Sequence, residues 1–291
     1  MSTLNLAHLA TFRLVIQRRS FSAAADVLGI SQPAVSLQIR QLEQFLRTRL
    51  VERTGRGIKA TAAGMALLEH GERITRVVED ALHSLDEYSH EVSGTITLGT
   101  GATACIHLLP PLLQQLREAH PLLRVGVTTG NTPDIVRAVE ENRLDMGLVT
   151  LPVNGRGLEV TPVREEEFVY ITAGQALQPP TPTALHPLPL IAFESGSGTR
   201  ALIDGWFAAQ GLQAEPVMQL GSIEAIKRMV RAGLGYSIVP RMAVEQTEDR
   251  QGLCVQSLTP VLHRQLATVM RQDKVLSKGI SGIIRLLQKA K

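Results

Sequence analysis

Polar side chains that could read the edges of DNA bases lie close together near the N-terminus. Gln32 and Gln38 each offer a donor and an acceptor, which suits adenine, and Ser36 can bond to more than one base. Pro33 and Leu37 present apolar surface to a thymine methyl group. This chemistry is recognition by hydrogen bonds and van der Waals contact, and it requires an element that enters a DNA groove.

Two helices joined by a glycine turn are expected to hold these side chains. Residues 22–28 predict a short helix with Ser22 as its N-cap, and Gly29 ends it because glycine readily adopts the left-handed conformation. Ser31 caps a second helix, whose first turn tolerates Pro33 because no backbone donor is needed there. The apolar face of this second helix is formed by Val35, Ile39 and Leu42. The pattern predicts a helix-turn-helix.

Positive charge is concentrated in the same segment. Residues 1–61 carry nine basic and three acidic residues, a net charge of +6, whereas the whole chain carries +3. A basic segment of this kind suits the DNA phosphate backbone, although a solvated basic face would have the same composition. The side chains expected to meet phosphates or a narrow minor groove are Arg40, Arg53 and Arg56.

Residues 20–43, SFSAAADVLGISQPAVSLQIRQLE, resemble the DNA-binding signature of LysR-type transcriptional regulators nearly position for position. Residues 50–64, LVERTGRGIKATAAG, resemble the wing of that family, followed by a threonine that caps the next helix. Two departures, Arg47 in place of a frequent glycine and Val51 in place of a frequent phenylalanine, are expected to affect the packing of the wing. The resemblance implies a winged helix-turn-helix domain at 1–61 that contacts DNA through Ser31, Gln32, Pro33, Ser36, Leu37, Gln38, Arg40, Arg53 and Arg56.

A long helix is expected next, because residues 61–91 contain no proline and are rich in helix-forming residues. A helix of roughly thirty residues spans about 45 Å, which is too long for one wall of a small core. Apolar residues recur in alternating steps of four and three, as in a coiled coil, at Leu67, Gly71, Ile74, Val78, Ala81, Leu85, Tyr88 and Val92. Residues 62–92 are therefore predicted to be a dimerising linker, with packing on its own domain as the alternative. The predicted dimer contacts are Ile74, Val78, Ala81, Leu85 and Tyr88.

Strands and helices alternate through the remaining residues, which predicts a mostly parallel sheet with helices on its faces. Strands are expected at 94–101, 124–129, 145–150, 168–173, 188–193, 216–220, 236–240 and 265–271, and helices at 106–117, 133–142, 199–210, 222–232 and 276–289. Two such units with two crossovers resemble the type II periplasmic-binding-protein fold that LysR-type regulators use as a sensor. The resemblance implies an effector-binding domain at 93–291, with lobe I at about 93–162 plus 266–291 and lobe II at about 163–265.

Small hydroxyl and glycine residues follow the carboxyl ends of several predicted strands, where open α/β sheets bind ligands. Backbone N–H groups, hydroxyls and positive helix ends could cradle a small anion there without a lysine or arginine. The same residue types also cap helices, so part of the set is expected to be structural. The residues predicted to contact an effector are Thr100, Ala102, Thr103, Thr129, Ser195, Ser197 and Ser222.

Other kinds of function are disfavoured. The sequence around Ser195 lacks a Gly-x-Ser-x-Gly nucleophile elbow, and the stretch from Gly99 lacks the third glycine of a dinucleotide fingerprint, so no catalytic residue and no cofactor is assigned. The eight histidines are scattered singly, so no metal is assigned. Cys105 could report oxidation beside the pocket, but a small buried residue is the simpler interpretation, because its only companion is Cys254.

The expected class is an α/β protein with an N-terminal all-α winged helix-turn-helix, a long linker helix and a two-lobed α/β sensor. No apolar run reaches the roughly 18 residues of a membrane span, and no signal peptide is recognisable, so a reduced, cytoplasmic protein is expected. The expected function is transcriptional regulation modulated by a small, anionic metabolite. The expected partners are promoter DNA, the effector, further copies of the chain as homodimer and homotetramer, and RNA polymerase, with no membrane.

Overall fold

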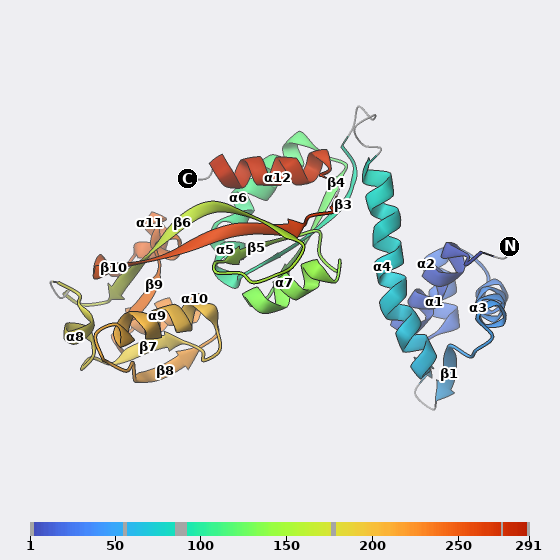
Figure 1. Ribbon diagram of the computed structural model, residues 1–291. Coiled ribbons are helices and arrows are strands. Elements are labelled where there is room, and N and C mark those ends of the chain that lie inside the picture. The colour runs from blue at the N-terminus through green and yellow to red at the C-terminus, as the bar shows by residue number, and fades with distance from the viewer. Residues whose placement is uncertain (1–2, 55–56, 85–91, 176–178, 275, 290–291) are drawn as a thin grey trace. The chain divides into compact units, whose positions relative to one another are not determined.

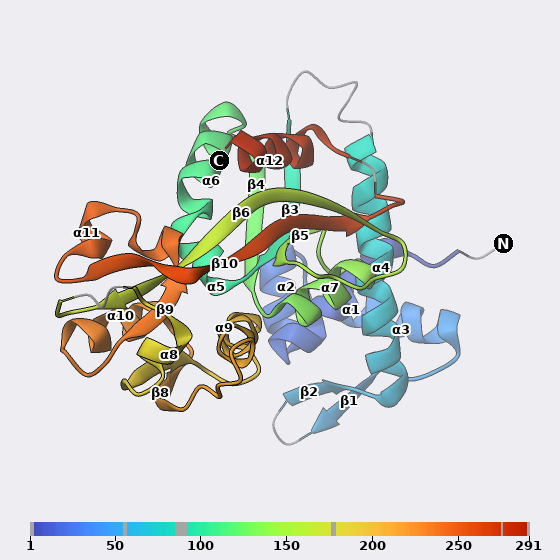
Figure 2. The same cartoon turned by 60° about the vertical axis from the view of Figure 1, so that its left-hand side comes forward.

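The computed structural model of the 291-residue chain describes residues 3–54, 57–84, 92–175, 179–274 and 276–289. The chain divides into two compact units, residues 1–82 and residues 83–291. Figures 1 and 2 show the elements of each unit in two views.

The first unit contains three short helices, a two-stranded hairpin and a long helix (Figure 1). Ser20, and not Ser22, caps the second helix, because the Ser20 side chain accepts a hydrogen bond from the Ala23 N–H. The predicted cap at Ser22 is therefore wrong. Gly29 ends this helix in the left-handed conformation, with φ 65°. The elements are α1 (Leu6–Arg18), α2 (Phe21–Leu28), α3 (Gln32–Leu46), β1 (Val51–Thr54), β2 (Gly57–Ala60) and α4 (Ala62–Ser84).

One apolar core joins the three helices to the hairpin. Phe12 of α1, Ala24 of α2 and Val35 of α3 are fully buried in it. Glu43 on α3 accepts hydrogen bonds from the N–H groups of Leu50 and Val51, and so fixes the start of the wing against that helix. The wing is the antiparallel pair β1–β2.

Arg47 ends α3 in the left-handed conformation, with φ 52°. A residue other than glycine costs roughly 1–2 kcal/mol in this conformation, which accounts for the glycine that relatives often carry there. Arg47 therefore acts at the C-terminal end of α3, directly before the wing.

The first turns of α4 belong to the core of the first unit. Thr61 caps the helix as predicted, since its hydroxyl accepts a hydrogen bond from the Gly64 N–H at 3.0 Å. Leu67 and Leu68 pack against the core, and Gly71 lies against the side chain of Leu9. The beginning of the predicted seam is therefore covered by the chain's own domain.

The next turns of α4 carry apolar side chains toward solvent. Ile74 is half-buried, Ala81 is exposed, and Val77 and Val78 are 61% and 36% exposed. The helix is described as far as Ser84. The other two predicted dimer contacts, Leu85 and Tyr88, lie outside the described residues.

The second unit is built on a six-stranded sheet with the order β4-β3-β5-β10-β6-β9. β3 pairs in parallel with β4 and β5, whereas β10 pairs antiparallel with β5 and β6. Helices α6 and α12 lie on one face of its first half and α7 on the other (Figure 1). The elements of this half are β3 (Gly94–Thr100), α5 (Ala102–His107), α6 (Leu109–Ala119), β4 (Leu123–Thr129), α7 (Thr132–Glu140), β5 (Met146–Thr150) and α12 (Lys278–Lys289).

A second lobe surrounds the other end of the sheet and a separate parallel pair, β7–β8. Its core contains Phe168, Trp206 and Ile226, and the Trp206 indole donates a hydrogen bond to the Pro260 carbonyl at 2.7 Å, so this tryptophan is a core residue. The elements are α8 (Pro182–Leu185), β7 (Leu190–Phe193), α9 (Gly198–Ala208), β8 (Pro216–Leu220), α10 (Ile223–Arg231), β9 (Ser237–Pro240), η2 (Arg241–Val244) and α11 (Thr247–Arg250).

Two long strands, β6 (Leu158–Thr172) and β10 (Cys254–Arg271), cross between the lobes side by side (Figure 2). The sequence predicted only their ends, at 168–173 and 265–271. The predicted helix 106–117 is two helices, because α5 begins directly after Gly101 and the prolines in the first turn of α6 start a new helix. The cavity described next lies beside these crossing strands.

Candidate DNA-reading helix and interlobe cavity

The first two turns of α3 present polar and apolar side chains together. Ser31 caps the helix by accepting a hydrogen bond from the Ala34 N–H, and it is exposed like Pro33. Gln32 donates a hydrogen bond from Nε2 to the Ser36 hydroxyl at 2.7 Å. Leu37 is 51% exposed although it is apolar. These turns have the composition that direct readout of a major groove needs.

The remaining predicted DNA contacts occupy different settings. The Gln38 Oε1 accepts a hydrogen bond from the Thr11 hydroxyl of α1 at 2.5 Å, which fixes this amide between the two helices. Arg40 is exposed on α3. Arg53 lies on β1, and its side chain is not described; Arg56 lies outside the described residues.

A cavity of about 290 Å³ lies between the two lobes of the second unit. Its lining includes residues at the N-terminal ends of α7, α9 and α10, where unpaired N–H groups and the helix dipole favour an anion. Ser197, for example, caps α9 by accepting a hydrogen bond from the Arg200 N–H. Four of the predicted effector contacts line the cavity, namely Ala102, Thr103, Thr129 and Ser197.

Three predicted effector contacts do not line it. Thr100 is completely buried at the end of β3, and its hydroxyl has no hydrogen-bond partner among the described residues. Ser195 is exposed in the loop after β7. Ser222 caps α10 through the Ala225 N–H. Local sequence marks all of these as helix starts or strand ends, and only the rotation of each element decides which side chain faces the cavity.

Arg264 lines the cavity but was not among the effector contacts predicted from the sequence. It lies on β10 opposite Glu166 of β6, lines the cavity, and is only 8% exposed. Its guanidinium lies 5.4 Å from the centre of the Phe168 ring, and its Nε has no hydrogen-bond partner among the described residues. Burial lowers the pKa of Arg264 to about 10, although the Glu166 carboxylate opposes this effect. The cavity lining thus includes an arginine, which the predicted anion cradle did not contain.

Neither cysteine forms a disulfide bond. Cys105 on α5 and Cys254 on β10 are both free and half-buried. Within the part of the chain that the structure describes, no helix is long and apolar enough to cross a membrane.

Comparisons with known proteins agree with this architecture. The family model "Bacterial regulatory helix-turn-helix protein, lysR family" matches residues 6–65, and the model "LysR substrate binding domain" matches residues 89–291. The chain is 31% identical to the HTH-type transcriptional regulator CbbR of Rhodospirillum rubrum, covering 98% of this chain and 96% of that protein. It is 30% identical to the HTH-type transcriptional regulator YfeR of Shigella flexneri, covering 96% and 92%.

Solved structures are similar to this chain over nearly its whole length. A cysteine mutant of Corynebacterium glutamicum OxyR matches with a TM-score of 0.68 and 26% identity, covering 99% of this chain and 93% of that one. Full-length CbnR in complex with its target DNA matches with a TM-score of 0.73 and 20% identity, covering 99% and 100%. The chain belongs to the LysR family of DNA-binding transcriptional regulators, with a helix-turn-helix domain followed by an effector-binding domain.

Proposed function

We propose that α3 reads base edges of a promoter and that a small anion in the interlobe cavity controls how the protein acts there. The observation that carries the DNA half is the first turns of α3, where the half-buried Gln32–Ser36 pair and the exposed, apolar Leu37 lie together. The observation that carries the effector half is a buried arginine, Arg264, facing a cavity bounded by three helix N-termini. The apolar face of α4 beyond Gly71 joins two copies, and further pairing gives a tetramer.

The effector acts by favouring one arrangement of the two lobes over another. A ligand shifts such an equilibrium only through a difference in its affinity for the two arrangements. Both lobes and β10 contribute to the cavity lining, so contacts with Thr103, Ser197 and Arg264 can all form only when the lobes are close together. RNA polymerase is a further partner expected of a transcriptional regulator.

Replacing Gln32 by alanine should lower affinity for the target site by about 10-fold or more, since a base contact is worth roughly 1–3 kcal/mol. Binding to random DNA should stay nearly unchanged. The target site can be selected from random duplexes with the wild-type protein. Affinities for the selected and the random duplexes are then measured by fluorescence anisotropy. Arg40→Ala is the matched control on the same helix, and it should weaken both kinds of binding and reduce the salt dependence. An equal loss on selected and random DNA for Gln32→Ala would remove this residue from base readout.

We expect a small anion to raise the Tm of the full chain. The screen tests sulfate, phosphate and small mono- and dicarboxylates at constant ionic strength, and at least one of them should raise Tm. An anion at a hundred times its dissociation constant adds about 2.7 kcal/mol, which for a unit of this size shifts Tm by several degrees. Arg264→Met should abolish the shift and Arg264→Lys should reduce it, because lysine cannot present the planar fork of donors.

Arg117→Met is the control, since it removes an exposed arginine of α6 that is not part of the cavity lining. An anion that stabilises Arg264→Met as much as the wild type would bind elsewhere. If no small anion stabilises the wild-type chain, the occupant of the cavity is not of this class.

A further inference from the structure

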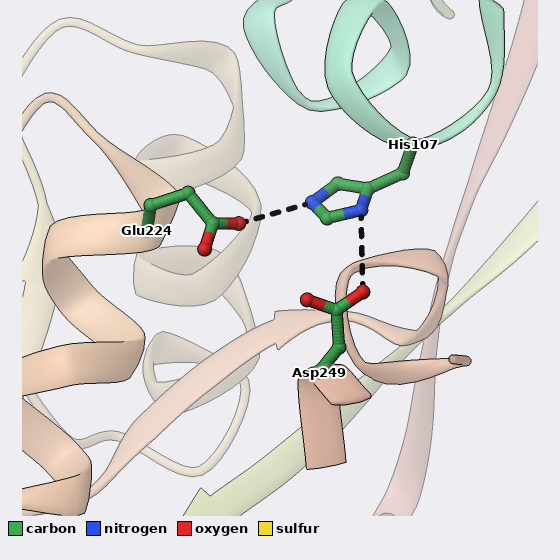
Figure 3. Close-up of side chains that lie close together, drawn as sticks. All are labelled: His107, Glu224 and Asp249. Atoms are coloured by element: carbon green, nitrogen blue, oxygen red, sulfur yellow. Dashed lines mark ion pairs between the residues drawn. The ribbon is translucent and has the colours of Figure 1, made fainter. Parts of the chain in front are cut away.

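A second group of ionisable side chains joins the two lobes outside the residues that line the cavity. His107, at the end of α5 in the first lobe, faces Glu224 of α10 and Asp249 of α11 in the second lobe (Figure 3). The His107 Nε2 lies 3.4 Å from Glu224 Oε1, and Nδ1 lies 3.8 Å from Asp249 Oδ2. Each ring nitrogen thus points to a different carboxylate, and Figure 3 shows the ring inserted between them.

Lys227 already neutralises one of the two carboxylates. Its ammonium group is completely buried and lies 2.7 Å from Glu224 Oε1 and 2.6 Å from Asp249 Oδ1. It also donates a hydrogen bond to the Ala243 carbonyl at 2.9 Å. A divalent cation among His107, Glu224 and Asp249 would therefore sit beside a fixed positive charge, so the cluster is poorly suited to a metal ion.

The His107 side chain is only 8% exposed, and its Nε2 makes no hydrogen bond with the described residues. Burial and then the charge of Lys227 lower the pKa of His107 below its ordinary value, against the opposing effect of Asp249 and Glu224. Arg231 of α10 and Arg250 of α11 are close to the cluster in the chain, but their guanidinium groups donate to backbone carbonyls, those of Gln251 and Asp249 for Arg231 and that of Val244 for Arg250. The imidazole is therefore neutral at neutral pH while the lobes are together.

Two of the three helices of this cluster, α5 and α10, also line the effector cavity. Ala102 and Thr103 of α5 line the cavity, whereas His107 lies at the other end of that short helix. Ile223 of α10 lines the cavity, and Glu224 is the next residue. Any separation of the lobes that opens the cavity must also withdraw His107 from the two carboxylates and return it to water.

We propose that His107 is a proton-sensitive interlobe latch: the lobes close over the neutral imidazole, and a proton on the ring favours their separation, because the imidazolium would be buried beside the Lys227 ammonium that already pairs with Glu224 and Asp249. The proposal rests on the proposed role of the cavity. It adds that affinity for the effector decreases as the pH is lowered. A histidine whose pKa is lowered in the closed state contributes stability that is present above its unperturbed pKa of 6.5 and is lost as pH falls through the lowered value.

The first test is the titration of the His107 ring, followed by NMR in the full chain without effector. The resonance is assigned by its absence in His107→Gln, and its midpoint should lie below 6.5. A midpoint at or above 6.5 would mean that the lobes bind the imidazolium form, and the proposal would be overturned.

The second test is hydrogen exchange measured by mass spectrometry at about pH 7.5 and about pH 5.5, corrected for intrinsic exchange rates. Peptides containing α5 and α10 should lose protection at the lower pH in the wild type but not in His107→Gln or His107→Asn, whose neutral amides cannot be protonated. His186→Gln, at an exposed histidine of the second lobe, should behave as the wild type. Equal loss of protection in His107→Gln and wild type would exclude the latch. Neither test involves an effector, so both can fail while the anion assignment stands.

Discussion

Replacing Val78 by glutamate should convert the self-associated protein to monomers and weaken its binding to target DNA by about 100-fold or more. Val77 and Val78 are exposed apolar residues of α4 beyond the turn that packs on Leu9 of α1. In a two-fold dimer, the new carboxylates of the two copies would be buried close to each other without a cation to pair with, which is costly. Separate monomers lose the gain of about 10²–10⁴ that comes from binding two half-sites at once.

Sedimentation velocity and anisotropy on the selected duplex measure the two effects. Glutamate is a better helix former than valine, so α4 itself should persist in the variant. Arg73→Glu is the matched control, because Arg73 is exposed and lies about 140° around the helix from Val78. An unchanged sedimentation profile for Val78→Glu would place the dimer contact on another surface.

The helix-turn-helix could be predicted closely because its signals are local. Ser31, Pro33 and Gly29 act within a turn of their own positions, and the structure shows the cap and the glycine turn as expected. The wrong N-cap prediction at Ser22 also arises from a local signal. Ser20 and Ser22 each stand three residues before a backbone N–H from which they could accept a hydrogen bond, and the packing of the helix decides in favour of Ser20.

The cavity could be predicted only in part, because its central cation depends on a long-range pairing. Arg264 meets Glu166 across β6 and β10, nearly a hundred positions apart in the chain. The charged run from Arg164 to Glu167 has the pattern of a solvated loop, yet Glu166 is buried and accepts a hydrogen bond from the Met242 N–H. Burial raises the pKa of Glu166, so the carboxylate beside Arg264 is a weaker partner than its charge alone suggests.

The interlobe cluster gave no signal in the sequence at all. His107, Glu224 and Asp249 come from three separate helices, and their spacing matches no ligand motif. Lys227 follows Glu224 by three residues, which on an exposed helix would be an ordinary surface pair. Only the packing of α10 shows that this lysine is completely buried.

Replacing Lys227 by methionine should lower the Tm of the second unit by roughly 5–10 °C at neutral pH. Removing one member of a buried ion pair costs about 3–5 kcal/mol, and partial exposure of Glu224 and Asp249 reduces this to about 2–3 kcal/mol. Each kcal/mol shifts Tm by about 2–4 °C in a unit of this size. Arg228→Met, at the exposed neighbour on the same helix, should change Tm by about 1 °C or less.

The loss of Tm caused by Lys227→Met should also depend on pH, and it should become smaller as the pH is lowered. The positive charge of Lys227 lowers the pKa of His107, so its removal raises that pKa and lets the imidazolium take over as the partner of Glu224 and Asp249. Scanning calorimetry should therefore find a smaller difference in Tm from the wild type at about pH 5.5 than at about pH 7.5. A difference in Tm that stays constant across this range would show that His107 does not share the carboxylates with Lys227. As the control, Lys227→Met should lower the Tm of the His107→Gln variant by the same amount at both pH values.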